Sequence, residues 1–405
     1  MKKFAAYILA GCMAMSCIYP YEAELDSIAG TLVVEGDIIL GDYSSFTVSW
    51  ATSVDGVLFN DTGFGFGYGF GNIWVENEHG DVFRQEYVPY RGLAVDLRNA
   101  PDDCRYRLHI SIPQMDVDQT YKNLRDGNGG KNYVSSWREP QKAPTIDAIT
   151  FEFEPSDNPY LRRPTGNARI SMTAPDGASR YFRWDYEEEW QFHANYDPQF
   201  DYDFENEEYV SVMQLPGPNY WCWAKSYSSQ SRIAIAIGDE KNKIHEHKFM
   251  EINTGTGNRF QKRYCVHVIA RGISEECYQY LHTLEMNSNS TGDLFAPIPS
   301  ELRGNIICEE DPDELVLGFI EVSRTSELRA FVPYGNGVYL DRGDGPLESL
   351  IAVDASRIST YYKWGYRPVV TVPTDHGDYM GWAPDYWIDC RAMGGTNVKP
   401  DYWED

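Results

Sequence analysis

Apolar and polar residues alternate in many short segments of this chain. The first two, residues 32–40 and 45–50, are rich in β-branched and aromatic side chains and have turn-forming residues between them. An alternation with a period of two places every second side chain on the same face of a β-strand. The pattern therefore predicts a mainly β protein whose strands each bury one face.

The strands before residue 140 form a first run. Beyond the first two segments, we expect its strands at residues 72–76, 82–90 and 106–112. Several short strands at this spacing, with turn signals between them, are typical of a β-sandwich. We therefore predict an N-terminal, Ig-like β-sandwich at residues 29–142, which ends in the proline-bounded segment 140–144.

The alternating pattern resumes after this segment. We expect strands at residues 146–153, 168–172, 181–186, 232–237, 263–270 and 315–322. One helix is predicted near residues 274–286, because Ser274 can cap it and apolar side chains then recur at near-helical spacing. These elements predict a larger β-rich domain with minor helix at residues 143–405.

The first residues have the layout of a secretory signal. Two lysines precede an apolar run that ends at Ala10, and small residues lead into Cys12 and Cys17. The run is too short and too early to be a membrane-spanning helix. We predict a lipoprotein signal peptide at residues 1–16, a lipid on Cys17 and a tether at residues 17–28.

Cys12 is the alternative lipid site. The three residues before Cys12 match the lipoprotein cleavage pattern better than those before Cys17 do. Cleavage before Cys12 leaves only about seven apolar residues, however, which is the low limit for a secretion signal, so we favour Cys17. No later segment approaches about 18 consecutive apolar residues, and we expect membrane attachment through the lipid.

Charge and cysteine content narrow the class of protein further. The formal net charge of −26 repels the phosphate backbone, so we expect no nucleic-acid partner. Two of the eight cysteines lie in the signal region, and the remaining six contain no Cys-x-x-Cys pair: Cys104, Cys222, Cys265, Cys277, Cys308 and Cys390. Export permits disulfides among these six, but their spacing does not determine the pairing.

Signatures of catalysis are absent from the sequence. There is no Gly-x-Ser-x-Gly, no His-Glu-x-x-His and no Walker loop. The glycine-aromatic stretch at residues 63–71 has Gly-x-Gly spacing, but a strand follows it where a dinucleotide loop needs a helix. We interpret this stretch as a hairpin tip or an irregular edge strand, and we expect a non-enzymatic protein without a cofactor.

Two segments offer metal ligands. His245 and His247 are expected on the same face of a strand, but no third ligand is indicated and nearby lysines favour a solvated turn. Oxygen ligands for calcium are available from Asp197, Asp201, Asp203 and Glu205. Because these acids lack the glycine of a helix-loop-helix calcium loop, we interpret both segments as solvated loops and predict no metal site.

Aromatic residues make up 14% of the chain and include 11 tryptophans. We expect most of these rings to pack in the core or between domains. A smaller set is predicted to form a stacking platform for a glycan, a peptide or another flat ligand: Trp190, Trp221 and Trp223.

Several fragments of the sequence occur together in a fixed order. The most specific is the tail at residues 389–403, which joins Asp-Cys-Arg, a Gly-Gly turn and Lys-Pro-Asp-Tyr-Trp. The other fragments are residues 32–36, 144–147, 181–190, 222–223, Tyr280 with Leu284, 299–306 and 316–319. With this set the chain resembles, over essentially its whole mature length, an uncharacterised lipoprotein family of Bacteroidota catalogued as domain of unknown function 4249.

The resemblance implies an outer-membrane lipoprotein, often encoded beside a TonB-dependent transporter of the starch-utilisation type. It supports Cys17 as the anchor, because members usually begin shortly before a segment like Pro20-Tyr21-Glu22, and it supplies no active-site residues. The family tail often reads Cys-x-Asp-Cys, whereas Trp387 stands at the first of these positions here. The resemblance thus leaves Cys390 either free or paired with a distant cysteine such as Cys222.

These expectations combine into one functional hypothesis. The chain is expected to be a surface-exposed outer-membrane lipoprotein that acts as a non-enzymatic accessory or substrate-binding subunit of a TonB-dependent transporter. Three acids behind the anchor, Glu22, Glu24 and Asp26, favour the cell surface over the periplasmic face, by analogy with acidic export signals. The alternative is a free-standing surface module for glycan binding or adhesion.

Overall fold

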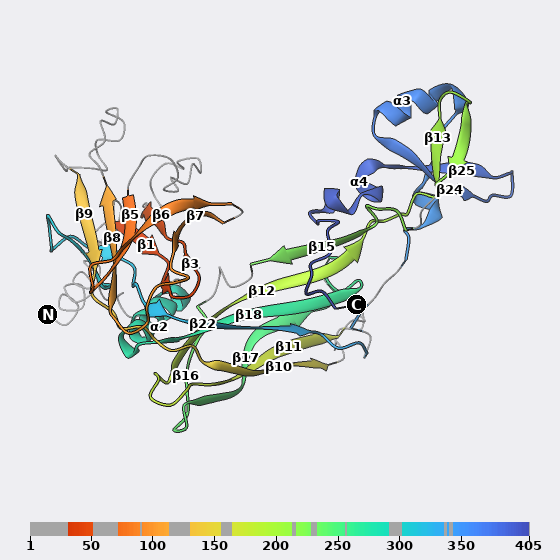
Figure 1. Cartoon of the computed structure of the whole chain (residues 1–405). Coiled ribbons are helices and arrows are strands. Elements are labelled where there is room, and N and C mark those ends of the chain that lie inside the picture. The colour runs from red at the N-terminus through yellow and green to blue at the C-terminus, as the bar shows by residue number, and fades with distance from the viewer. Residues whose placement is uncertain are drawn as a thin grey trace, which may run out of the picture.

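The computed structural model describes residues 31–51, 72–89, 91–112, 130–154, 164–212, 216–227, 233–255, 257–290, 302–335, 338–339 and 343–404. Within these ranges the protein is mainly β with few helices, which confirms the predicted fold class. Figure 1 shows an elongated molecule with a β-sandwich at one end, a second pair of sheets in the middle and a small subdomain at the other end. The predicted signal, Cys17, the tether and the glycine-aromatic stretch lie outside the described residues.

The first sandwich is built from two main sheets and one further strand pair. The strand orders are β19-β9-β8-β5-β6-β7-β3, β20-β1-β4 and β2-β21. Their bounds are β1 Leu32–Glu35, β2 Ile38–Ile39, β3 Tyr43–Ser44, β4 Thr47–Trp50, β5 Asn72–Asn77, β6 Val82–Val88, β7 Gly92–Asp96, β8 Tyr106–Ile112, β9 Lys131–Ser135, β19 Ile306–Cys308, β20 Val316–Leu317 and β21 Val322–Ser323. Strict alternation along β8 buries Tyr106, Leu108, Ile110 and Ile112, as the sequence pattern predicts.

The chain returns to this first sandwich late in the sequence. β19 pairs with β9, and β20 and β21 run parallel to β1 and β2, with Leu32 opposite Val316 and Ile38 opposite Val322. Buried side chains of this returning segment, including Ile320, pack in the same core as Leu32. The predicted boundary at residue 142 assigns this segment to the larger domain, whereas the sheets place it with the N-terminal strands.

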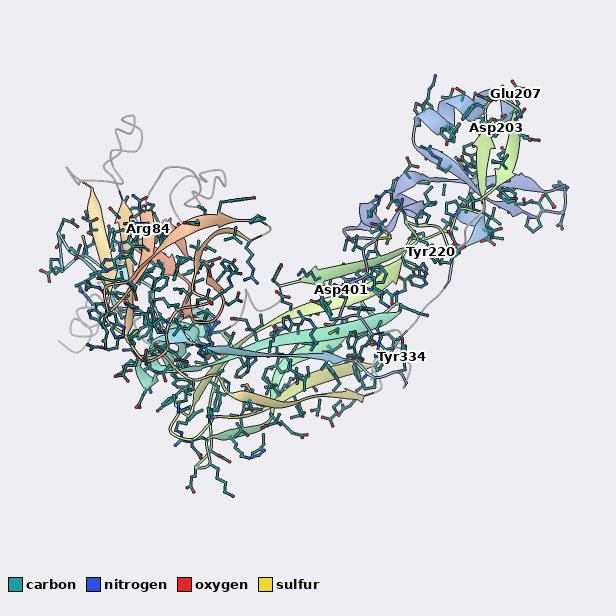
Figure 2. All side chains as sticks on the ribbon, in the orientation of Figure 1. Arg84, Asp203, Glu207, Tyr220, Tyr334 and Asp401 are labelled. Atoms are coloured by element: carbon teal, nitrogen blue, oxygen red, sulfur yellow. A yellow bond between two sulfur atoms is a disulfide. The ribbon has the colours of Figure 1, made fainter. Side chains whose placement is uncertain are left out.

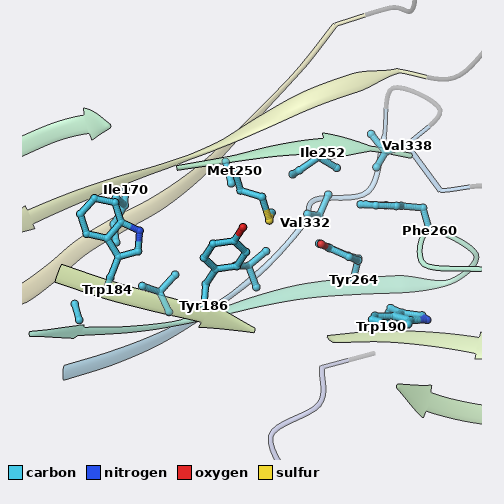
Figure 3. Close-up of a cluster of buried hydrophobic side chains, with 14 of the residues drawn as sticks. Ile170, Trp184, Tyr186, Trp190, Met250, Ile252, Phe260, Tyr264, Val332 and Val338 are labelled. Atoms are coloured by element: carbon cyan, nitrogen blue, oxygen red, sulfur yellow. The ribbon is translucent and has the colours of Figure 1, made fainter. Parts of the chain in front are cut away.

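The second sandwich packs a three-stranded sheet against a five-stranded one. The strand orders are β10-β11-β17 and β15-β12-β18-β22, with β16 paired to β12. Their bounds are β10 Thr145–Glu154, β11 Thr165–Thr173, β12 Tyr181–His193, β15 Trp221–Ser226, β16 Ile235–Ile237, β17 Lys243–Asn253, β18 Arg263–Ile273 and β22 Thr325–Phe331. Figure 3 shows the buried side chains between the sheets, with Tyr186 and Tyr264 of the five-stranded sheet facing Met250 and Ile252 of the three-stranded one.

The helix α2 (Glu275–Ser290) begins where the sequence predicts it. The Ser274 hydroxyl accepts a hydrogen bond from the Cys277 backbone N–H at 3.2 Å, which is an N-cap contact. Tyr280 packs on Phe319 of the returning segment, with ring centroids 5.6 Å apart. In the part of the chain that the structure describes, no helix has the length and apolar character needed to cross a membrane.

Buried charges join the first sandwich to the second. The Asp37 carboxylate lies 3.0 Å from the Arg183 guanidinium and 3.4 Å from that of Arg271. On the first-sandwich side, Glu321 is fully buried and accepts a hydrogen bond from the Ser274 N–H at 2.8 Å. Each of these four ionised groups has a polar or charged partner, so none of the four is left as an uncompensated charge.

The far end is a separate small subdomain, which we call the distal subdomain. Its strands are β13 Phe200–Asp203, β14 Glu208–Ser211, β23 Ile351–Ala352, β24 Tyr366–Val372 and β25 Tyr379–Pro384, and its helical turns are η3 Leu347–Ser349, η4 Ala355–Arg357, α3 Ile358–Lys363, α4 Asp385–Ile388 and η5 Cys390–Met393. It has its own small core of Tyr196, Leu350, Val369, Val372 and Ala383. Among its described residues, the predicted single larger domain therefore contains more than one hydrophobic core, those of the second sandwich and of the distal subdomain included.

Candidate functional site

The three tryptophans of the predicted platform lie on opposite faces of one sheet. In the pairing of β12 with β15, Trp190 lies opposite Ala224, Trp223 opposite Gln191 and Trp221 opposite His193. Since successive side chains point to opposite faces of a strand, Trp190 faces the inner core while Trp221 and Trp223 face outward. The three rings therefore do not form one stacking surface.

Trp190 is a core residue. Its side chain is only 9% exposed, its indole N–H donates to the Asn258 side-chain oxygen at 3.1 Å, and the Arg259 guanidinium lies 4.9 Å from its ring centroid. A ring held in this way contributes to packing. Of the predicted set, only the two tryptophans of β15 face outward.

Trp221 and Trp223 are half-buried. The Trp221 ring lies 5.2 Å from those of both His193 and Tyr220, in edge-on contacts. Trp223 pairs through its backbone with Thr396, with N–H···O distances of 2.8 Å in both directions. The C-terminal tail therefore occupies the free edge of β15, beside Trp223.

The candidate calcium ligands of the acidic segment have separate protein partners in the structure. The Asp203 carboxylate accepts from the N–H of Glu205 at 2.8 Å and so closes its own turn, while Asp201 accepts from the Tyr362 hydroxyl at 3.1 Å. Asp197 accepts from the Gly217 N–H at 3.0 Å, and burial raises the pKa of its carboxyl. Asp197, Asp201 and Asp203 are thus each engaged by a different protein group.

The two histidines of β17 also have different surroundings. Glu246 between them adopts a positive φ of 42°, and the pairing with β11 shifts register nearby, which is the signature of a bulge. His245 lies 3.7 Å from Asp239 on the surface. His247 packs edge-on against Trp184 at 5.4 Å, and burial lowers its pKa.

One disulfide ties the tail to the second sandwich. Cys222 of β15 and Cys390 of η5 are bonded across a sequence separation of 168 residues. This confirms one of the two alternatives for Cys390, pairing with Cys222. The other described cysteines, Cys104, Cys265, Cys277 and Cys308, are buried thiols, and burial raises the pKa of Cys265 to about 12.

Beyond the disulfide, the tail crosses the outer face of β12, β18 and β22. Trp403 packs edge-on against Phe331 at 5.1 Å, and the Arg329 guanidinium lies 4.1 Å from the Tyr402 ring centroid. Figure 2 shows the neighbouring Asp401 beside this sheet. Two of the fragments that carry the family resemblance, residues 181–190 and the tail, thus lie against each other and enclose polar side chains between them.

The distal subdomain carries a group of closely spaced rings, which we call the distal aromatic cluster: Tyr202, Phe204, Tyr361, Tyr362, Trp364 and Tyr366. Phe204 of the β13–β14 hairpin meets Tyr362 of α3 edge-on at 5.0 Å. Tyr361 lies 5.4 Å from the rings of both Trp364 and Tyr366. These contacts join a hairpin and a helix that are about 160 residues apart in sequence into one aromatic surface.

Parts of this cluster are strongly exposed. Trp364 is 67% exposed and Phe204 is 48% exposed, whereas a large ring normally buries most of its surface. The Arg367 guanidinium stacks on Tyr362 at 3.9 Å, and the hairpin acids Asp203 and Glu207 lie at the far end of the molecule (Figure 2). Rings combined with charged groups can hold a ligand by stacking and by hydrogen bonds.

The sequence alone does not single out this cluster. Two of its members, Tyr202 and Phe204, belong to the acidic segment whose carboxylates are candidate calcium ligands. The other four fall within residues 361–366, where four of six positions are aromatic. That local density is the signal that could have found the cluster, but only the fold brings the hairpin to the helix.

Comparison with known proteins identifies a family that is described as a domain of unknown function. The model of the domain of unknown function DUF4249 matches residues 18–329, which is well over half of the chain. The chain therefore belongs to this family. No curated protein matches it.

Proposed function

We propose that this protein is an exported, lipid-anchored binding subunit at the outer membrane that serves a TonB-dependent transporter. In this proposal Cys17 carries the lipid, and the distal aromatic cluster contacts the transporter or a substrate destined for it. The transporter partner comes from the family resemblance, and the binding surface comes from the geometry.

The observation that carries the proposal is the exposure of the distal aromatic cluster. Trp364 and Phe204 leave 67% and 48% of their surfaces open to solvent, although the subdomain has its own buried core. Exposed apolar surface of this kind on a folded protein marks an interaction site. The cluster lies at the end of the molecule opposite the N-terminal sandwich (Figure 1), where it can reach a partner away from the anchor.

Two further features support export. The Cys222–Cys390 disulfide fits an oxidising compartment outside the cytoplasm. The net charge of −26 keeps such a body away from anionic lipid head groups, which suits a protein held at the membrane by its lipid alone.

The test is co-purification from cells in mild detergent. We expect the wild-type protein to recover a β-barrel transporter, and the double substitution F204A/W364A to lower that recovery at least tenfold. The matched control is Tyr87→Ala, since Tyr87 is 68% exposed on the first sandwich and lies outside the cluster. Equal recovery with all three proteins, or no transporter with any of them, would overturn the proposal.

A free-standing glycan-binding module is the second candidate. The half-buried Trp221, with Tyr220 and His193 beside it and the Lys262 ammonium 5.6 Å from its ring centroid, favours a sugar-sized ligand on the outer face of β15. Glycan-array binding that is lost with Trp221→Ala but kept with F204A/W364A would favour this candidate. The reverse pattern would favour the distal cluster.

A further inference from the structure

A group of ionisable side chains lies on the outer face of the second sandwich, beneath the tail. In the pairing of β12 with β18, Glu187 stands opposite His267, and Glu189 is the next residue of β12 on the same face. One carboxylate oxygen of each acid and one ring nitrogen of His267 all lie within 4.8 Å of one another. Three potential ligand atoms thus converge on one point.

Glu189 is the group that needs a partner. It is only 1% exposed, and both of its carboxylate oxygens are buried without a hydrogen bond of ordinary geometry. The Tyr402 hydroxyl of the tail lies beside this carboxylate. A buried carboxylate with so little compensation is costly, and a cation is the partner that removes most of that cost.

His267 is oriented like a metal ligand. Its Nε2 atom lies 2.8 Å from the Glu327 carboxylate, and in the tautomer that donates Nε2–H to Glu327 the Nδ1 lone pair faces the cluster. Nδ1 lies 3.5 Å from a Glu187 oxygen. A carboxylate that fixes one nitrogen of an imidazole while the other binds metal is the usual arrangement around histidine ligands.

We propose that Glu187, Glu189 and His267 bind a divalent first-row transition metal, for which Zn²⁺ is the test ion. An imidazole nitrogen with two carboxylates suits zinc and its neighbours, whereas calcium and magnesium prefer oxygen ligands alone. Zinc bonds of about 2.0–2.2 Å place ligand atoms roughly 3.4 Å apart in tetrahedral geometry. The three atoms lie within 4.8 Å of one another, so metal binding would draw them closer together.

Arg329 is the internal competitor of the metal. Its Nη2 atom lies 3.2 Å from Nδ1 of His267, so it occupies the direction from which a metal would bind. The guanidinium also stacks on Tyr402, and metal binding requires it to withdraw from the imidazole towards that ring. The competition predicts that removing the Arg329 charge strengthens metal binding.

The experiment titrates the purified mature protein with Zn²⁺ by calorimetry and with Co²⁺ by visible absorption. We expect one ion per chain, a rise in melting temperature with zinc, and Co²⁺ bands typical of a low-coordinate nitrogen–oxygen site. Glu189→Gln, which has nearly the same shape, should weaken binding at least tenfold, and so should Glu187→Gln. Circular dichroism and melting curves verify that both variants are folded.

Two further variants sharpen the test. Arg329→Met should tighten Zn²⁺ binding several-fold, because it removes the competing cation. His245→Ala, which removes an exposed imidazole outside the cluster, should leave binding unchanged. Absence of zinc binding by the wild type and by Arg329→Met overturns the proposal, and so does zinc binding that Glu189→Gln and Glu187→Gln leave undiminished.

Discussion

At the residue scale, the Cys222–Cys390 bond matters most, because it fixes the tail near the start of β15. Cys222 and Phe192 both lie within 3 Å of the position that a Cβ on Gly395 would occupy, so only glycine fits where the tail crosses them. A covalent bond that closes 168 residues of sequence removes much of the freedom of the unfolded chain.

Breaking this bond should therefore destabilise the protein. We expect Cys390→Ala to lower the free energy of unfolding by about 2–5 kcal/mol, as measured by urea denaturation. Reductant should destabilise the wild type by a similar amount and leave Cys390→Ala unchanged. The matched control is Cys104→Ala, a buried thiol in the first sandwich, whose response to reductant should equal that of the wild type.

Asp389, next to this disulfide, gives a prediction about pH. Its carboxylate accepts from the Arg391 guanidinium at 2.6 and 2.9 Å, and this hydrogen bonding holds the pKa of Asp389 below its usual value. A lowered folded pKa means that the contact stabilises the protein above the unfolded pKa of about 3.9. The stabilisation is lost as the pH falls through the lower folded pKa.

Asp389→Asn should therefore cost roughly 1 kcal/mol near neutral pH and progressively less as the pH falls below about 4. Urea denaturation of both proteins at pH 7 and pH 3 measures the difference. A difference in the free energy of unfolding that stays constant between the two pH values would show that the charge of Asp389 does not contribute to stability. Asp401→Asn, elsewhere in the tail, is the control and should show no such trend.

At the element scale, the alternation of apolar and polar residues predicts where the strands lie, but it does not predict which strands pair. The expected strands at residues 106–112 and 146–153 correspond to β8 (Tyr106–Ile112) and β10 (Thr145–Glu154). These strands could be predicted because the alternation of buried and exposed positions depends only on neighbouring residues. The return of Val316 and Val322 to β1 and β2 depends on hydrogen bonds across more than 280 residues. No local pattern encodes such a partner, so the predicted division at residue 142 could not anticipate it.

The same limit applied to the candidate site. The sequence alone does not distinguish Trp190 from Trp223, but the register of β12 with β15 places them on opposite faces of the sheet. The sequence leaves the partner of Cys390 open for the same reason, since spacing alone does not place the tail beside β15. The Glu187–His267 contact likewise exists only once β12 and β18 are in register.

The junction between the two sandwiches yields a prediction at this scale. Asp37→Ala would remove the carboxylate that lies 3.0 Å from the half-buried Arg183 and 3.4 Å from the buried Arg271. We expect a loss of about 3–5 kcal/mol in urea denaturation, together with faster proteolysis between the sandwiches. Asp185→Ala removes a partly exposed partner of the same Arg271, and it should cost about 1 kcal/mol or less. Equal losses from both substitutions would contradict the role assigned to Asp37.

At the scale of the whole molecule, the elongated shape separates the proposed point of attachment from the proposed binding surface. The N-terminal sandwich begins at Leu32, close behind the predicted tether, and the distal aromatic cluster lies at the opposite end (Figure 1). The two sandwiches and the distal subdomain each have their own hydrophobic core, so a change at one end need not disturb the other. The proposed anchor and the proposed binding surface should therefore be separable by mutation.

Cys17→Ala and F204A/W364A test this separation directly. We expect Cys17→Ala to lose palmitate labelling and leave the membrane fraction, while the purified protein still captures the transporter from detergent extract. F204A/W364A should keep its label and membrane position, lose the transporter, and melt within about 2 °C of the wild type, because the substituted rings are largely exposed. A label that persists in Cys17→Ala would move the anchor to Cys12. If Cys17→Ala also loses capture from extract, binding depends on the lipidated end and the distal cluster is not the contact surface.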